Sequence, residues 1–142
     1  MTYWIRRASL CGGALVLVSA ALAAGASSAG AAAADLDFHQ KCASPSAGEY
    51  ESVAYDQNNH YSGLALFEAN GDKMQAVDPR SDGYYVVAHL STGRTASTKG
   101  HGTYSPWATG DLPEKHTYYM YVEMVAADGL SSTSLPSCKV VS

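Results

Sequence analysis

The sequence predicts an all-β protein: a small single-domain antiparallel β-sandwich with one disulfide, preceded by a signal peptide. Short runs of β-branched and aromatic residues recur along residues 42–142, and turn residues separate them. Amphipathic helix periodicity is nearly absent from the same region. Two cysteines, Cys42 and Cys138, lie near its opposite ends. Together these three observations favour a sandwich domain over residues 42–142.

Residues 1–34 have the layout of an export signal. They contain no acidic residue and carry the basic pair Arg6 and Arg7, then an apolar run, then a tract of Ala, Gly and Ser. A basic start, an apolar stretch and small residues before the cleavage point define a secretory signal. The apolar run is marginal in length for the roughly 20 residues of a spanning helix. We therefore expect cleavage near Ala34, secretion of residues 35–142, and no stable membrane anchor.

The expected exported part is acidic. Residues 35–142 hold all 13 acidic residues and seven of the nine basic ones, a formal charge of −6. An acidic surface argues against nucleic acid as a partner, because nucleic-acid-binding domains carry a basic stripe. No run of lysines indicates an anionic membrane surface.

The two cysteines of the exported part are expected to pair with each other. Cys11 falls within the signal, which leaves Cys42 and Cys138 in an oxidising compartment. A bridge between them closes a loop of nearly the whole domain, which the chain-entropy model values at roughly 4–5 kcal/mol. Two free thiols or an intermolecular bridge are the alternative.

Strand and turn signals divide the domain into short segments. An Asn-Gly pair at residues 70–71 predicts a hairpin between residues 62–69 and 73–78, because both turn residues must tolerate positive φ. Residues 84–91 are β-branched and aromatic, as in a buried strand. The clearest strand spans residues 117–127. Further strands are expected at residues 50–55, 94–98, 103–107, 130–135 and 137–141.

Residues 117–127 alternate two faces along one strand. One face holds Tyr118, Met120, Val122, Met124 and Ala126, and the other holds Tyr119, Tyr121, Glu123 and Val125. One face must enter the core, so Tyr119 and Tyr121 are expected to point outward. Nine tyrosines make the domain aromatic-rich, and tyrosine is enriched at protein interfaces. Tyrosine also packs well on pleated sheets, and outward tyrosines can equally stack on sugar rings.

Residues 112–132 resemble the end of a fibronectin type III or similar immunoglobulin-like domain. Leu112 precedes Tyr118 by six residues, the spacing of a tyrosine corner, and the strand ends in an Asp-Gly pair followed by serines. Two features depart from the family pattern: Pro113 directly follows the leucine, and the early-strand tryptophan is missing. The resemblance implies an immunoglobulin-like sandwich and says little about function.

No catalytic or metal-binding constellation is expected. The five histidines lie at least 12 residues apart, whereas zinc ligands cluster at tight spacings. There is no G-x-S-x-G nucleophile elbow. Carboxylate pairs such as Glu49 and Glu51 fit a solvated strand face. We therefore predict a non-enzyme without catalytic residues, a metal site or a cofactor.

The N-terminal segment, residues 35–41, is an extended tail or an edge strand. Polar and apolar residues alternate in it, so that Leu36 and Phe38 share one face. Because it precedes the predicted disulfide loop, it can add itself as a strand to another protein. We favour the alternative that it forms the first strand of its own sheet, because sandwich edges are usually paired internally.

These observations favour a secreted, non-catalytic protein-binding module. The expected partner is another secreted protein, contacted through Leu36 and Phe38 or through Tyr119 and Tyr121. In size and layout the chain is similar to the small adaptor subunits of secreted umbrella-type antibacterial toxin particles, which implies an adaptor in an extracellular assembly. The alternatives are a secreted inhibitor of an extracellular hydrolase, presenting residues 98–105 as a rigid loop, and a carbohydrate- or cell-wall-binding module with a glycan partner.

Overall fold

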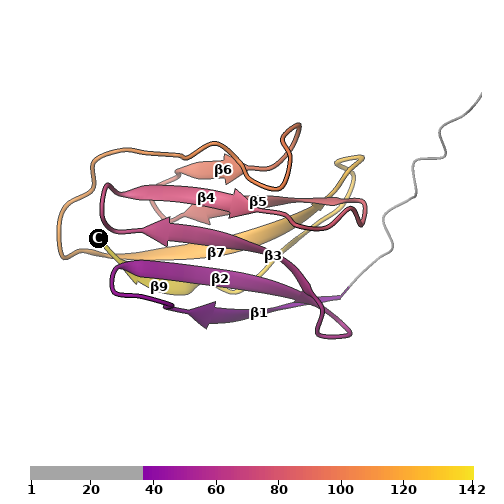
Figure 1. The fold of residues 1–142 in the computed structure, drawn as a ribbon, viewed down its shortest axis with the longest axis horizontal. Coiled ribbons are helices and arrows are strands. Elements are labelled where there is room, and N and C mark those ends of the chain that lie inside the picture. The colour runs from indigo at the N-terminus through magenta and orange to yellow at the C-terminus, as the bar shows by residue number, and fades with distance from the viewer. Residues whose placement is uncertain (1–36) are drawn as a thin grey trace, which may run out of the picture.

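The computed structural model describes residues 37–142, so the predicted signal peptide and Leu36 lie outside the described residues. This part contains nine strands and no helix. Sheet A has the strand order β1–β2–β3–β4, with β1 (Phe38–Ala43), β2 (Glu49–Asp56), β3 (Tyr61–Glu68) and β4 (Lys73–Val77). Sheet B has the order β6–β5–β7–β8, and β9 also pairs with β7 (Figure 1). Its strands are β5 (Tyr84–Leu90), β6 (Thr95–Ser97), β7 (Thr117–Ala126), β8 (Ser132–Ser134) and β9 (Cys138–Val141).

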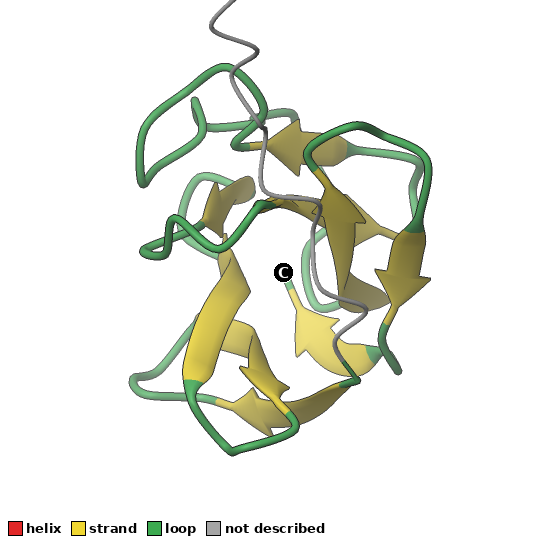
Figure 2. Ribbon diagram, turned by 90° about the vertical axis from the view of Figure 1, so that its right-hand side faces the viewer, coloured by secondary structure: helices red, strands yellow, loops and turns green. Residues whose placement is uncertain are grey.

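The two sheets pack face to face around one core (Figure 2). All the strand pairs are antiparallel. The largest fully buried apolar side chains come from both sheets: Phe67, Met74, Val86, Met120, Met124, Val122 and Val140. The predicted all-β antiparallel sandwich is therefore confirmed.

The hairpin of β3 and β4 forms at the predicted place, but its loop spans residues 69–72, so Asn70 and Gly71 do not form a two-residue turn. Glu68 pairs with Lys73 at the last register position before the turn, and their side chains form an ion pair of 2.7 Å. Gly71 and Asp72 have φ values of 88° and 47°. These positive angles explain why the turn takes a glycine, which adopts them at no steric cost.

Strand β7 is the centre of sheet B. One edge pairs with β5 from Tyr84↔Ala126 to Leu90↔Met120. The other edge is shared, because β9 pairs with the first part of β7 and β8 with the later part. Pro136 lies between these two strands and cannot donate a ladder hydrogen bond, which explains the interruption.

One side of the sandwich is closed by the predicted disulfide. Cys42 on β1 is bonded to Cys138 on β9, with a Cα–Cα distance of 5.6 Å. Strand β1 is the outer strand of sheet A, and β9 lies at the outer edge of β7 in sheet B. The bond therefore joins the edges of the two sheets.

The opposite side is closed by the long connection between β6 and β7. Its residues 104 and 108 form isolated bridges with Val77 and Met74 on the edge of β4. The predicted strand 103–107 is reduced to these two bridges, because Pro106 lacks an N–H and the Ser105 hydroxyl accepts the Ala76 N–H at 2.9 Å.

Arg94 holds this connection in place. Its Nη1 donates to the Asp72 carbonyl and its Nη2 donates to the Gly110 carbonyl at 3.0 Å. The Asp72 carboxylate in turn accepts the Leu112 N–H at 2.8 Å. Two backbone segments that are far apart in sequence are thus fixed by one guanidinium and one buried carboxylate.

The N-terminal segment forms the edge strand of the protein's own sheet. Strand β1 pairs with β2 over its whole length, from Phe38↔Asp56 to Ala43↔Glu51. The Phe38 ring packs edge to face on Tyr84, with ring centroids 5.1 Å apart. The described part of the segment therefore follows the favoured alternative of internal pairing.

Candidate binding surfaces

The outward side of sheet A is unusually apolar. Ala54, Ala65 and Ala76 face the core, so their neighbours along the strands point outward. Cross-strand register places these neighbours in one row, Val53–Leu64–Val77–Tyr104, and Leu66 lies in the next row. An antiparallel sheet with one solvated face normally carries polar residues there. This row breaks that rule.

Aromatic side chains border the apolar row. Tyr104 is 63% exposed, Trp107 38% and Tyr61 37%. Tyr55 lies beside Tyr61, with ring centroids 6.4 Å apart. We call the surface formed by Val53, Tyr55, Tyr61, Leu64, Leu66, Val77, Tyr104 and Trp107 the sheet A face.

Two lysines lie over the aromatic rings at its margins. Lys41 Nζ is 5.2 Å from the centre of the Tyr55 ring, and Lys73 Nζ is 4.6 Å from the centre of the Trp107 ring. Cation–π contacts of this kind extend to about 6 Å. The two lysines therefore add positive charge at the margins of this otherwise apolar and aromatic surface.

Burial, together with the nearby Glu51 carboxylate, raises the pKa of the Tyr61 hydroxyl to about 12. The hydroxyl therefore stays neutral at physiological pH and keeps its proton for donation. A neutral phenol in an apolar surface is well suited to a desolvated interface, because it brings no buried charge.

The outward side of sheet B carries the predicted tyrosines. Tyr119 is 53% exposed, and Tyr121 stacks on His89 with centroids 4.6 Å apart and planes 6° apart. His89 Nε2 lies 2.8 Å from Glu123 Oε2. We call Tyr85, His89, Tyr119, Tyr121 and Glu123 the sheet B face. Serines and threonines surround it on the neighbouring strands: Thr95, Ser97, Ser132 and Ser134.

The predicted partner-binding residues do not form one surface. Leu36 lies outside the described residues. Phe38 is half-buried and packs against the core from sheet A, whereas Tyr119 and Tyr121 lie on the outside of sheet B. The sandwich therefore separates them.

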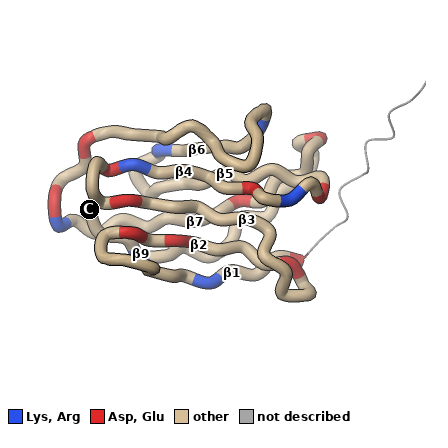
Figure 3. Tube along the Cα trace, viewed as in Figure 1, with Lys and Arg blue, Asp and Glu red and all other residues tan. Residues whose placement is uncertain are grey.

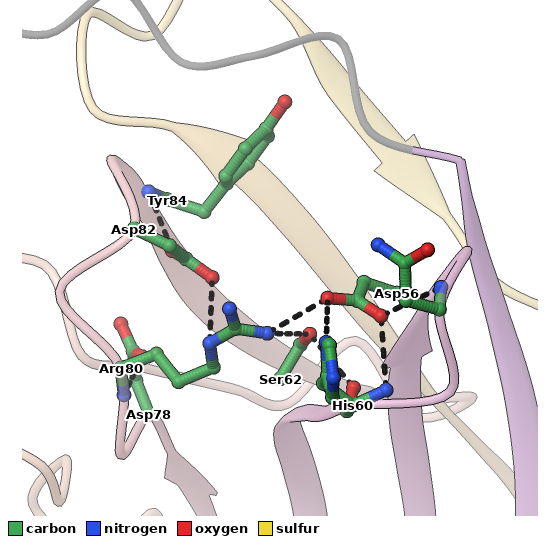
Figure 4. A network of polar contacts seen from close by, with 8 residues as sticks. Asp56, His60, Ser62, Asp78, Arg80, Asp82 and Tyr84 are labelled. Atoms are coloured by element: carbon green, nitrogen blue, oxygen red, sulfur yellow. Dashed lines mark hydrogen bonds and ion pairs between the residues drawn. The ribbon is translucent and has the colours of Figure 1, made fainter.

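A buried ion-pair network lies at the end of the sandwich where β2 and β4 finish (Figure 4). The Asp56 carboxylate, in a residue only 3% exposed, accepts the backbone N–H groups of Asn58 and His60, each at 2.9 Å. Arg80 Nη1 donates to Asp56 at 3.0 Å, and Arg80 Nε lies 3.6 Å from Asp82. The network fixes the β2–β3 turn against the β4–β5 connection.

Burial raises the pKa of the Asp56 carboxyl, but the hydrogen bonds from the His60 and Asn58 backbone and from the Arg80 guanidinium lower it by more. The net result is a pKa well below the usual value of 3.8. The charged form is thus strongly favoured in the folded protein, which makes this carboxylate a structural group and not a proton donor.

The chain matches no protein-family model, and neither a curated protein nor a solved structure shows significant similarity to it. The surfaces and side chains of this protein alone therefore indicate its function. Within residues 37–142 no three His, Cys, Asp or Glu side chains gather as metal ligands. The same residues contain no helix long and apolar enough to span a bilayer.

The sheet A face was missed at the level of sequence. Residues 63–67 form one apolar run, and a run that is apolar on both faces shows no alternation to indicate which side is outward. The available signal was the pair Leu64 and Leu66, which share a face opposite to Ala65 and Phe67. The ion-pair network was also missed, because its members come from two segments that are far apart in sequence.

Acidification tests the network. Because the pKa of Asp56 is lower in the folded than in the unfolded chain, its contribution to stability is complete above 3.8 and is lost as the pH falls towards the folded pKa. We expect Asp56→Asn to be clearly less stable than the wild type at about pH 6, and this difference to shrink at about pH 2. Urea unfolding at both pH values measures it.

The comparison with Asp56→Asn is needed because Asp78 changes the stability with pH in the opposite direction. Burial raises the pKa of the Asp78 carboxyl, so its effect favours the folded state as the pH falls through its folded pKa. A difference between wild type and Asp56→Asn that stays constant across this pH range would contradict the role assigned to Asp56.

Proposed function

We propose that this protein is an exported, non-catalytic binding module that recognises another protein through the sheet A face. The observation that carries the proposal is the apolar row Val53–Leu64–Val77 on the outside of a sheet, with Leu66 beside it. Contiguous apolar patches on soluble proteins mark interaction sites. Val53 and Val77 are themselves only 7% and 9% exposed, so neighbouring side chains of the face cover most of them. The accessible part of the patch is formed by the half-buried Leu64 and Leu66 and the exposed aromatic rings.

The composition of the border supports a protein as the ligand. Trp and Tyr dominate the energetic centres of protein interfaces, because they bury large rigid areas at a small entropic cost. Tyr61, Tyr104 and Trp107 provide such groups around an aliphatic centre. Glu51, Glu68 and Gln75 lie on the same face and provide a polar rim.

An adaptor role is supported by the position of the second surface. The sheet B face lies on the opposite side of the sandwich from the sheet A face, so one module can contact two molecules at once (Figure 2). Its tyrosines among serines and threonines resemble the composition of antibody paratopes. The disulfide is compatible with an extracellular assembly.

We also infer an immunoglobulin-like relationship of the fibronectin type III kind for the part that begins at β3. In one sheet β3, β4 and the segment 104–108 are neighbours, and in the other the order is β6–β5–β7–β9. This arrangement supports that relationship, with the β1–β2 hairpin as an addition at one edge. It supports the architecture and carries no function by itself.

Affinity capture tests the proposal. The tagged protein is purified from its native culture supernatant, and co-purifying proteins are identified by mass spectrometry. Leu66→Lys places a charge in the sheet A face and is expected to reduce the captured partner at least tenfold. Leu130→Lys is the control, because Leu130 is an exposed apolar residue of the β7–β8 turn that belongs to neither face.

Both variants must keep the melting temperature of the wild type for the comparison to count. If Leu66→Lys captures as much partner as the wild type, the sheet A face is not the binding surface. If no protein co-purifies and the chain is instead retained by insoluble cell wall, the exposed rings of Tyr104 and Trp107 bind glycan and the protein-binding proposal fails.

A further inference from the structure

A polar pocket of about 250 Å³ opens beside the sheet A face. It is lined by the β4–β5 connection and by the segment that follows β6: Asp78, Pro79, Arg80, Ser81, His101, Gly102 and Thr103. Asp78 directly follows Val77, and Tyr104 directly follows Thr103. The Asp78 N–H donates to the Thr103 carbonyl at 2.7 Å, which joins the two walls. The pocket therefore begins where the apolar row ends.

The charges around this pocket are not balanced. The connection that follows β4 carries one basic position between two acidic ones (Figure 3). The Arg80 guanidinium is already committed to Asp56 and Asp82, at 3.0 and 3.6 Å. One cation thus faces three carboxylates, and Asp78 is the one without an ion-pair partner in the described part of the chain.

The Asp78 carboxyl is placed to accept a further donor. Its Oδ1 accepts the backbone N–H of Arg80 at 3.1 Å, and no hydrogen bond to its Oδ2 is formed within residues 37–142. Burial raises the pKa of this carboxyl and the Asp82 carboxylate raises it further, against the Arg80 hydrogen bond and charge. A half-buried carboxylate that is short of positive charge is stabilised by any cation that reaches it.

The size of the pocket limits what can enter. Sites that enclose a drug-sized molecule measure about 300–1,000 Å³, so this pocket suits a single head group. Lysine and arginine carry their charge at the end of an apolar stem, which can lie on apolar surface while the head group is bound. Tyr61 and Tyr104 both lie near Asp78, because Tyr104 follows Thr103 of the pocket wall and the Asp78 carboxylate contributes to the raised pKa of Tyr61.

We propose that this pocket receives a lysine or arginine side chain of the protein that docks on the sheet A face, with the Asp78 carboxylate as its counter-ion. The inference rests on the proposed function, and it specifies the partner: an apolar surface with a basic residue at one margin. The acidic charge of residues 35–142 favours the approach of such a partner.

The pocket is tested first without any partner. ¹⁵N-labelled protein is titrated with butylamine and with agmatine, which carry the two head groups, and with butanol as the neutral control. We expect saturable amide shifts at Asp78, Arg80 and Thr103 with the two cations and none with butanol. Asp78→Asn should weaken both cations at least tenfold, whereas Asp128→Asn, in the exposed β7–β8 turn, should leave them unchanged. Absence of saturable shifts at Asp78 would show that the pocket does not bind a cationic head group.

The second arm uses the captured partner. Asp78→Asn is expected to reduce the captured amount at least tenfold, as Leu66→Lys does. If Leu66→Lys abolishes capture and Asp78→Asn leaves it intact, the pocket does not receive a side chain of the partner, and the proposed function stands. If the wild-type chain captures no protein, the proposed function fails, and the assignment of the pocket to a partner's side chain fails with it.

Discussion

Replacing both bridged cysteines, Cys42→Ala together with Cys138→Ala, is expected to lower the free energy of unfolding by about 4–5 kcal/mol. The two residues are 96 positions apart, so the bond closes a loop of almost the whole domain. Constraint of the unfolded chain grows with the length of the closed loop, which places this bond near the upper end of disulfide effects. The loss is a large fraction of the 5–15 kcal/mol that a typical domain has.

Urea unfolding of the oxidised wild type, the reduced wild type and the double variant measures this effect. The last two should agree, because both lack the covalent link and keep every other strand contact. A double variant that loses less than about 1 kcal/mol would show that the unfolded chain is already compact enough for the bond to add little.

Gly63→Ala is expected to cost about 3 kcal/mol, at the upper end of the usual range for overpacking a core. Gly63 lies on β3 against Val86 of sheet B, and a Cβ there would be 2.5 Å from Val86 Cγ2 and 2.9 Å from the Val77 carbonyl oxygen. The valine can move to another rotamer. The carbonyl belongs to the ladder of β4, so relief requires a shift of backbone.

Gly102→Ala is the matched control, because nothing lies within 4 Å of its Cβ position and its φ is not in the left-handed region. It should change stability by less than about 0.5 kcal/mol. Combining Gly63→Ala with Val86→Ala separates the two clashes, because Val86→Ala removes the clashing Cγ2 methyl group and leaves the clash with the Val77 carbonyl oxygen. If Gly63→Ala is as stable as Gly102→Ala, the sheets are not in close contact at this point.

The strands were predictable because local chemistry determines most of their ends. The Asn-Gly pair at residues 70–71 and the alternation of residues 117–127 place a turn and a strand without reference to the rest of the chain. The disulfide followed from the number of cysteines in the predicted exported part. Pro136 ends one strand before β9 begins, as its missing N–H requires.

The candidate site could not be predicted in the same way, because it depends on which strands become neighbours. Val53, Leu64 and Val77 are ordinary strand residues until the register aligns them across sheet A. Asp78 and His101 belong to connections that only the return of residues 98–116 to sheet A brings together. Short-range patterns contain no information about either arrangement.

The two long sides of the sandwich are closed by bonds of different chemistry. One is closed by a disulfide and the other by hydrogen bonds of Arg94, so the two sides respond differently to a reductant. A thiol reductant cleaves the link between β1 and β9 and leaves the contacts of Arg94 with Asp72 and Gly110 intact. At the β1 border of the sheet A face, which includes Lys41, the covalent attachment to sheet B is therefore lost under reducing conditions, while the pairing of β1 with β2 is kept. The border with Tyr104 and the Asp78 pocket is held by hydrogen bonds alone, so its attachment does not depend on the redox state.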